Sequence, residues 1–251
     1  MGKGISSITI GIDEAGRGPV IGDLLLVIIG FNTNDLSHLE TMGVRDSKEL
    51  SPITRKKLFK KILEYSLIIY TASISPRTID RFNINKIIYE QIVQGLTILS
   101  KILNPYNNIK IIIDEIKGYD KKLRNKIYSI FANKNIDVII EPHADKNYVA
   151  VSAASIVAKY IRDENISVLK HLYGEMGSGY PSDQKTINWI KQIYETLEVP
   201  PPFIRLSWAT LKKIAPTWYS GSKHKTHKTI FDYLGKGGRV NGNKPASRSE
   251  G

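Results

Sequence analysis

Two segments of strand length end in acidic side chains, and they limit the fold more than any other feature of the chain. Residues 8–12 alternate apolar and small side chains and lead to Asp13 and Glu14, and the apolar residues 109–113 lead to Asp114. Alternation is typical of a strand, and a continuous apolar run is typical of a strand buried on both faces. If these two strands are neighbours, their acids lie at one edge of a covered sheet.

The rest of the chain alternates strand and helix patterns, which predicts an α/β fold. Further strands are expected at residues 24–31, 67–72 and 136–141, and helices at 52–65, 85–103, 119–132, from 149 onward and at 208–214. We expect the first two strands to pair as a hairpin. Ser51-Pro52 and Ser75-Pro76 each read as an N-cap followed by proline in the first helical turn.

Composition points to a polyanionic partner and narrows the choice of metal ligands. Lys and Arg exceed Asp and Glu by 36 to 24 in 251 residues, a formal net charge of +12. We infer that the partner is a nucleic acid, although selection for solubility or for stability at high temperature also produces lysine-rich surfaces. The chain has no cysteine, so a metal must bind oxygen or imidazole. No apolar run reaches the length of about 18 residues that a membrane span needs, and we expect a monomeric cytoplasmic protein.

A glycine-framed arginine follows the first strand. Gly16 and Gly18 allow the backbone to approach a ligand closely, and Arg17 stands between them. Asp13 and Glu14 would point to opposite sides of a continuing strand, so both serve one site only if the chain bends or the site lies at the strand's end. The alternative is that both acids are solvated and that Arg17 is their surface ion-pair partner.

A further acid, Asp145, stands between a predicted strand and a predicted long helix. Together with Asp13, Glu14 and Asp114 it comes from three separated segments that meet if the strands are neighbours. Four such carboxylates can hold two Mg²⁺ or Mn²⁺ ions, which activate water and stabilise a leaving oxygen. Each acid alone also has the plain reading of a surface residue, and it is their common placement that favours the metal site.

Six segments, taken in chain order, match the pattern of one family. They are Asp13-Glu14-Ala15-Gly16-Arg17-Gly18-Pro19, Asp46-Ser47-Lys48, Asp114, Ala144-Asp145 with Tyr148, residues 152–159, and Gly177-Ser178-Gly179-Tyr180-Pro181-Ser182-Asp183. Together they resemble type 2 ribonuclease H (ribonuclease HII), and the last resembles its archaeal branch. The resemblance spans roughly residues 8 to 212.

The resemblance implies a ribonuclease H-like mixed central sheet flanked by helices, plus a small helical C-terminal region. It divides the chain into a catalytic domain (1–176), a helical substrate-binding region (177–220) and a flexible basic tail (221–251). The implied activity is metal-dependent hydrolysis of the phosphodiester 5′ to ribonucleotides in RNA/DNA hybrids and in duplex DNA with embedded ribonucleotides. The products carry 3′-hydroxyl and 5′-phosphate ends, and the implied setting is DNA replication and ribonucleotide excision repair.

The resemblance also assigns residues. Asp13, Glu14, Asp114 and Asp145 match the catalytic, metal-binding carboxylates. The backbone of Gly16-Arg17-Gly18 matches the sensor of a ribose 2′-hydroxyl, the group that distinguishes RNA from DNA. Tyr180 matches the tyrosine that stacks under the sugar after the ribonucleotide. Candidates for phosphate contacts are Arg45 and Lys48.

Four positions near these motifs differ from the pattern or lack a firm role. Lys146-Asn147 replaces the Ala-Lys pair expected after Asp145, and Glu115 is a rival ligand beside Asp114. His143 either shuttles protons at the site or is a loop histidine that makes one hydrogen bond. Neither departure removes one of the four carboxylates.

The tail contains one apolar island, residues 227–234, within a stretch rich in glycine and basic side chains. The island resembles the sliding-clamp-binding box of replication proteins, with Ile230 as the aliphatic plug and Tyr233-Leu234 as the hydrophobic pair. His227 replaces the usual glutamine, and the alternative is a sticky or partly helical tail segment.

Two other functions stay open at this point. A junction resolvase or integrase-like nuclease on the same fold would share the carboxylates but would need no 2′-hydroxyl sensor. A nucleic-acid-binding or clamp-adaptor module without catalysis would bind in a salt-sensitive way and would not cleave. The Gly16-Arg17-Gly18 turn and Tyr180 argue against the resolvase, and the four carboxylates argue against the module.

Overall fold

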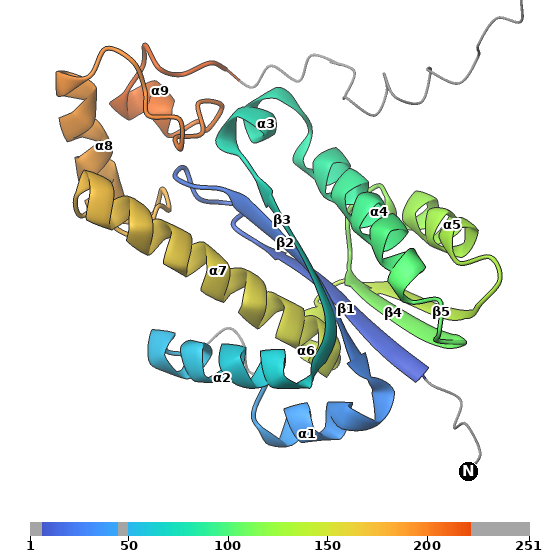
Figure 1. Cartoon of the computed structure of the whole chain (residues 1–251). Coiled ribbons are helices and arrows are strands. Elements are labelled where there is room, and N and C mark those ends of the chain that lie inside the picture. Colours follow the sequence, from blue (N-terminus) through green and yellow to red (C-terminus); the bar gives the residue numbers. More distant parts are fainter. Residues whose placement is uncertain (1–6, 45–49, 222–251) are drawn as a thin grey trace, which may run out of the picture.

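The computed structural model describes residues 7–44 and 50–221, and these form a mixed sheet with helices on both faces (Figure 1). The five strands lie in the order β3-β2-β1-β4-β5. Their bounds are β1 Ser7–Ala15, β2 Leu24–Asn32, β3 Ser66–Ile74, β4 Asn108–Asp114 and β5 Asn135–Glu141. The expected mixed sheet flanked by helices is confirmed.

The helices divide between the two faces of the sheet and its far end. In chain order they are α1 Leu36–Thr41 after a short 3-10 turn at Thr33–Asp35, α2 Pro52–Tyr65, α3 Pro76–Arg81, α4 Ile84–Ile102, α5 Asp120–Ile130, α6 Ala144–Asn147, α7 Val149–Tyr173, α8 Gln184–Thr196 and α9 Leu211–Ile214. Helix α7 covers one face with α1 and α2 against it, and α4 and α5 cover the other (Figure 1). Helices α8 and α9 gather beyond the end of the sheet.

Strand directions place the acidic ends together. Strand β1 is antiparallel to β2, which confirms the hairpin, and it is parallel to β4, which is itself parallel to β5. The carboxyl ends of parallel strands lie at the same edge of a sheet. Strands β1 and β4 are therefore neighbours, as the sequence analysis required, and the acids at their carboxyl ends lie at the same edge of the sheet.

The central strand β1 separates two apolar layers. Ile8, Ile10 and Ile12 pack in the layer under α4 and α5, whereas Ala15 belongs to the layer under α7. On the α7 face Gly11 allows the helix to approach, because a Cβ at this position would lie 2.0 Å from the carbonyl oxygen of Ala150. The first turn of α7 therefore rests directly on the backbone of β1.

A third apolar cluster joins the loop after β1 to the C-terminal helices. Val20 and Ile21 are fully buried among side chains of α8 and of residues 203–218. Ile21 also pairs with Ile204 as an isolated antiparallel bridge. The C-terminal region is thus packed against the loop that carries the glycine-framed arginine.

The structure departs from the predicted elements at several boundaries. Residues 144–147, which lie between a predicted strand and a predicted helix, form the short helix α6, and the helix predicted from residue 149 onward ends at Tyr173. The helix expected at 208–214 is confined to Leu211–Ile214. The reason lies in Asp80, whose carboxylate accepts hydrogen bonds from the backbone amides of Leu206 and Ser207. These bonds hold the preceding segment in an irregular course that a helix could not adopt.

No helix in the described part of the chain combines the length and the apolar character needed to cross a membrane.

Candidate active site

Asp13 lies within β1, on the face that α7 covers. Its carboxylate accepts hydrogen bonds from the backbone amide of Glu14 at 2.8 Å and from the hydroxyl of Ser155 on α7. Only 6% of the residue is exposed. Burial raises the pKa of the Asp13 carboxyl well above its usual range, and the negative charges of Glu14 and Asp114 raise it further.

Glu14 points to the other face of the same strand, because side chains alternate along a strand. Arg17 Nε donates to Glu14 Oε1 at 2.5 Å, and Arg17 Nη1 donates to Oδ1 of Asn85, in the first turn of α4, at 2.7 Å. Burial raises the pKa of Glu14, while the guanidinium of Arg17 opposes this rise and the charge of Asp114 adds to it. Arg17 therefore fixes and partly neutralises one of the two acids.

The remaining two acids are linked through the backbone. Asp114 is the last residue of β4, and its Oδ1 accepts a hydrogen bond from the amide of Ala144 at 3.2 Å. Ala144 begins α6, and the next residue, Asp145, is 5% exposed. Helix α6 thus brings Asp145 to the end of β4.

The strand does not bend between the two adjacent acids, since β1 stays paired with β2 through Glu14 and Ala15. Of the two arrangements that would let both acids serve one site, the structure leaves the one at the strand's end. Within residues 7–44 and 50–221, no three acidic or histidine side chains gather tightly enough to hold one ion as they stand. The acids share one edge of the sheet and repel one another across it.

The glycine-framed turn faces the predicted aromatic residue. Gly16 has a φ of 96°, and a Cβ there would lie 2.8 Å from the carbonyl oxygen of Asp23, so a side chain would be strained and crowded. A Cβ at Gly18 would lie 3.6 Å from the ring of Tyr180. Hydrogen bonds from the amides of Val20 and Ile21 to the carbonyl of Gly179 tie the two loops together. The turn and the ring therefore form one surface.

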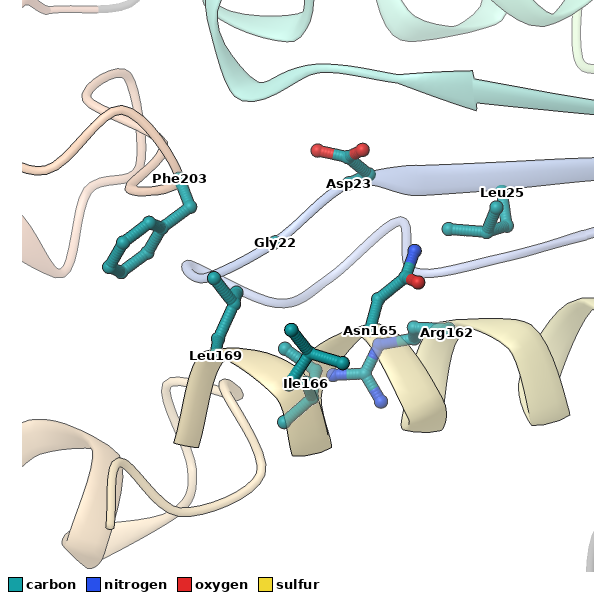
Figure 2. Close-up of a pocket in the computed structure, with 9 residues that line it drawn as sticks. Gly22, Asp23, Leu25, Arg162, Asn165, Ile166, Leu169 and Phe203 are labelled. Atoms are coloured by element: carbon teal, nitrogen blue, oxygen red, sulfur yellow. The ribbon is translucent and has the colours of Figure 1, made fainter. Parts of the chain in front are cut away.

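A buried arginine of α7 supports this surface from below. The guanidinium carbon of Arg162 lies 4.7 Å from the centre of the Tyr180 ring, and Nη2 donates to the carbonyl of Ser178 at 2.6 Å. Arg162 also lines a hollow of about 270 Å³. Figure 2 shows it on α7 with Asn165, across from the loop that carries Gly22 and Asp23.

The other residues singled out in the sequence either lie outside the described residues or lie next to the four acids along the chain. Arg45, Lys48 and the tail residues Ile230, Tyr233 and Leu234 lie outside the described residues. Glu115 follows the end of β4, and its backbone amide donates a hydrogen bond to the carbonyl of Glu141. His143 is exposed and adopts a left-handed backbone with a φ of 60°.

Several side chains at the site gave no signal of their own in the sequence. Asn85 is only the first residue of the helix predicted at 85–103, and its contact with Arg17 spans 68 positions. Ser155 belongs to a segment of the family pattern but carried no assigned role. Arg162 continues a helix whose small residues alone were noted. These residues can be assigned to the site only from the fold, which brings their segments to β1.

Comparison with known proteins identifies the family. A sequence model described as Ribonuclease HII matches residues 10–211. A Ribonuclease HII of Hyperthermus butylicus is 40% identical over 231 residues, which cover 90% of this chain and 94% of that protein. The crystal structure of ribonuclease H2 from Pyrococcus horikoshii is 35% identical with a TM-score of 0.73, covering 85% of this chain and 100% of the other.

A second solved structure is the complex of PCNA with RNase HII from Archaeoglobus fulgidus. It is 29% identical to this chain with a TM-score of 0.70, and the match covers 89% of this chain and 99% of the other. The matched family model spans the β1 acids, the glycine-framed turn, Asp114, Asp145 and Tyr180. The chain therefore belongs to the ribonuclease HII family.

Proposed function

We propose that this protein is an endonuclease that hydrolyses the phosphodiester 5′ to a ribonucleotide, in RNA/DNA hybrids and in duplex DNA with embedded ribonucleotides. The products carry 3′-hydroxyl and 5′-phosphate ends. The observation that carries the proposal is that the carboxylates of Asp13, Glu14 and Asp114 end β1 and β4, and that the loop after β1 places Gly18 against the ring of Tyr180, in a member of the ribonuclease HII family. The net charge of +12 favours a nucleic-acid substrate.

Asp13, Glu14, Asp114 and Asp145 are the side chains that would hold Mg²⁺ or Mn²⁺. The set consists only of carboxylate oxygens, the ligands that these hard cations prefer. Asp13 and Asp145 are buried, and the repulsion felt by Asp13 and Glu14 is relieved by a cation. Bound ions of this kind activate water and stabilise the leaving oxygen of a phosphodiester.

The chain's own groups hold the acids in place. The Ser155 hydroxyl and the Glu14 amide fix the carboxylate of Asp13. Arg17 fixes that of Glu14 and is held in turn by Asn85, whose amide nitrogen also donates to the carbonyl of Lys117 at 3.3 Å. Geometry that is set before the substrate arrives lowers the reorganisation needed for catalysis.

Substrate selection would rest on the turn and the ring. The backbone of Gly16-Arg17-Gly18 would contact the ribose 2′-hydroxyl, and the ring of Tyr180 would stack under the next sugar. Because Gly18 has no side chain, a sugar can lie against the backbone and the ring at once. Arg45 and Lys48, outside the described residues, are the proposed phosphate contacts.

Residues 1–176 would supply the catalytic domain, 177–220 the helical substrate-binding region and 221–251 a tail. In the tail Ile230, Tyr233 and Leu234 would bind a sliding clamp. The similar RNase HII of Archaeoglobus fulgidus, whose structure is a complex with PCNA, supports this. Tyr233→Ala should abolish capture by an archaeal sliding clamp, and capture that survives the change would remove the clamp proposal.

The activity is tested by incubating the protein with a labelled RNA/DNA hybrid and an all-DNA duplex, with Mg²⁺ or Mn²⁺ and with a chelator. We expect cleavage of the RNA strand only, dependent on metal and lost in Asp13→Asn. Binding without cleavage would favour the non-catalytic module. Cleavage of both duplexes would favour a resolvase-like nuclease.

A further inference from the structure

Arg205 is fully buried, and its guanidinium bonds to the backbone of the loop after β1. Nε donates to the carbonyl of Gly22 at 2.9 Å, and Nη1 donates to the carbonyl of Arg17 at 3.1 Å. One side chain thus holds both ends of the loop that contains the glycine-framed turn. The two bonds span 183 and 188 positions of sequence.

The neighbours of Arg205 bind the same loop. The indole nitrogen of Trp208 donates to the carbonyl of Gly18 at 2.9 Å, and the guanidinium of Arg205 lies 4.9 Å from the centre of the Trp208 ring. The backbone amide of Arg205 donates to the carbonyl of Val20 at 2.9 Å. Carbonyls at four positions of the loop are therefore occupied by donors from residues 205–208.

This donor segment is itself anchored to the rest of the fold. Asp80 of α3 accepts hydrogen bonds from the amides of Leu206 and Ser207 at 2.8 and 2.9 Å and from the hydroxyl of Ser207 at 2.6 Å. The position of the turn is thereby set from α3 through residues 205–208, in addition to its attachment to β1.

A gain in folding stability does not explain why the guanidinium of Arg205 is buried here. Burial, followed by the nearby charge of Arg162, lowers the pKa of Arg205 to about 10 although the charges of Asp23 and Asp80 oppose this fall, and the guanidinium stays protonated at pH 7. Among the described residues Nη2 of Arg205 has no hydrogen-bond partner. A desolvated charge that is incompletely bonded and lies beside a like charge is costly, and apolar side chains fill such space more favourably.

The geometry does fix the direction of one peptide group. A trans peptide is planar, with its carbonyl and its N–H pointing in opposite directions. Because Arg205 holds the carbonyl of Arg17, the N–H of Gly18 in the same peptide is turned away from Arg205. A rotated peptide would break this bond and would leave a second buried donor unpaired.

We infer that Arg205 is a positioning residue, which fixes the Arg17–Gly18 peptide and so the backbone that contacts the ribose 2′-hydroxyl. The inference rests on the proposed function. Lysine cannot replace arginine here, because one ammonium group lacks the planar fork that reaches two carbonyls in fixed directions. The positive charge is therefore insufficient, and the guanidinium shape is required.

The test measures kcat and KM of the full-length protein with Mg²⁺ on a duplex that contains one ribonucleotide. An all-DNA duplex is added as competitor to report general binding. We expect Arg205→Lys to lower kcat by about tenfold or more, since small misplacements at a reacting centre cost this much. KM and the inhibition constant of the competitor should stay within about twofold, because phosphate contacts outside the turn dominate binding.

Arg124→Lys is the control, because Arg124 also donates from its guanidinium to a backbone carbonyl, that of Val138 on β5. It should retain the wild-type kcat. Trp208→Phe is the second variant, since it removes the bond to Gly18 and keeps an aromatic ring at this position; it should lower kcat by about threefold or more with unchanged KM.

If Arg205→Lys folds and keeps the wild-type kcat, the inference is wrong while the proposed function stands. If Arg205→Lys fails to fold, Arg205→Gln decides in its place, because its amide lacks the guanidinium fork that reaches two carbonyls, and wild-type kcat in that variant overturns the inference. If the wild-type protein itself does not cut the ribonucleotide-containing strand, the proposed function fails, and the role of Arg205 fails with it.

Discussion

At the residue scale, Asp13 is a carboxylate in surroundings that disfavour its charge. Burial is the main cause, and the nearby charges of Glu14 and Asp114 act in the same direction. A carboxyl whose folded pKa lies above its ordinary value near 3.8 binds more protons in the folded than in the unfolded state. The stability of the metal-free protein therefore falls as pH rises from that ordinary value through the raised one.

Asp13→Asn removes this penalty, so it should raise the thermal midpoint of the metal-free protein at pH 7, by about 2–5 °C. The gain should shrink toward pH 4, where the wild-type carboxyl is protonated in the folded state. Thermal unfolding in the presence of chelator, at several pH values, measures this. A midpoint for the variant below that of the wild type at pH 7 would show that Asp13 is not strained by its surroundings.

The guanidinium of Arg162 on α7 lies over the Tyr180 ring, and the ring lies close enough to Gly18 that a Cβ there would be 3.6 Å from it. Tyr180→Phe keeps these contacts and should retain kcat/KM within about threefold on a duplex with one ribonucleotide. Tyr180→Ala removes the platform and should lower kcat/KM by about tenfold or more, because stacking on an aromatic side chain is worth about 1–3 kcal/mol. Equal losses in both variants would mean that the hydroxyl, and not the ring, is what the substrate uses.

At the element scale, the position of α7 against β1 depends on the absence of one methyl group. A Cβ at Gly11 would overlap the carbonyl of Ala150, at 2.0 Å, in backbone that belongs to the first turn of α7. Asp13 and its partner Ser155 lie further along the same two elements. A shift of α7 therefore reaches the site.

Gly11→Ala should lower the free energy of unfolding by about 3 kcal/mol or more, because the overlap is with backbone and cannot be relieved by a rotamer change. Gly43→Ala is the comparison, since Gly43 has a φ of 80° and a Cβ there would have no atom of the described residues within 4 Å. It should cost about 1 kcal/mol. Denaturant titration measures both, and equal losses would contradict the account of how α7 packs.

Much of the sheet followed from local patterns. Apolar runs that end in acids predicted β1 and β4, and Ser51-Pro52 predicted the start of α2, where the Ser51 side chain accepts a hydrogen bond from the Thr54 amide. The course of β1 past Asp13 was not predictable, because it depends on the pairing of Ala15 with Leu25 across the hairpin. Patterns within one segment carry no information about such pairing.

The supports of the site were less predictable still. The motifs marked the acids and Tyr180, but the hydrogen bonds that Arg17 donates to Asn85 and that Arg205 donates to Gly22 join segments far apart in sequence. Polar side chains that hold backbone carbonyls have no fixed spacing or composition. Residues 208–210 read as the start of a helix for the same reason, since the hydrogen bonds that the amides of Leu206 and Ser207 donate to Asp80 just before them are not local.

At the scale of the whole molecule, the C-terminal region and the loop after β1 share one apolar cluster, in which Val20 and Ile21 pack against α8 and residues 203–218. All three tryptophans of the chain, Trp189, Trp208 and Trp218, stand in this region. Tryptophan fluorescence therefore reports on the C-terminal side, whereas circular dichroism reports on all helices.

The two signals should change together in a denaturant titration, with one midpoint, because the shared cluster couples the regions. A fluorescence transition clearly before the circular dichroism transition would show that residues 177–220 unfold separately.

The most direct test of the central claim compares two duplexes that differ by a single 2′-hydroxyl. One carries a single ribonucleotide and the other the matching deoxyribonucleotide, and both are incubated with Mg²⁺ and mapped at nucleotide resolution. We predict one cut, on the 5′ side of the ribonucleotide, with 3′-hydroxyl and 5′-phosphate ends, and an intact all-DNA duplex. Cleavage of both duplexes at the same position, or of neither with Mg²⁺ or Mn²⁺, would contradict the account.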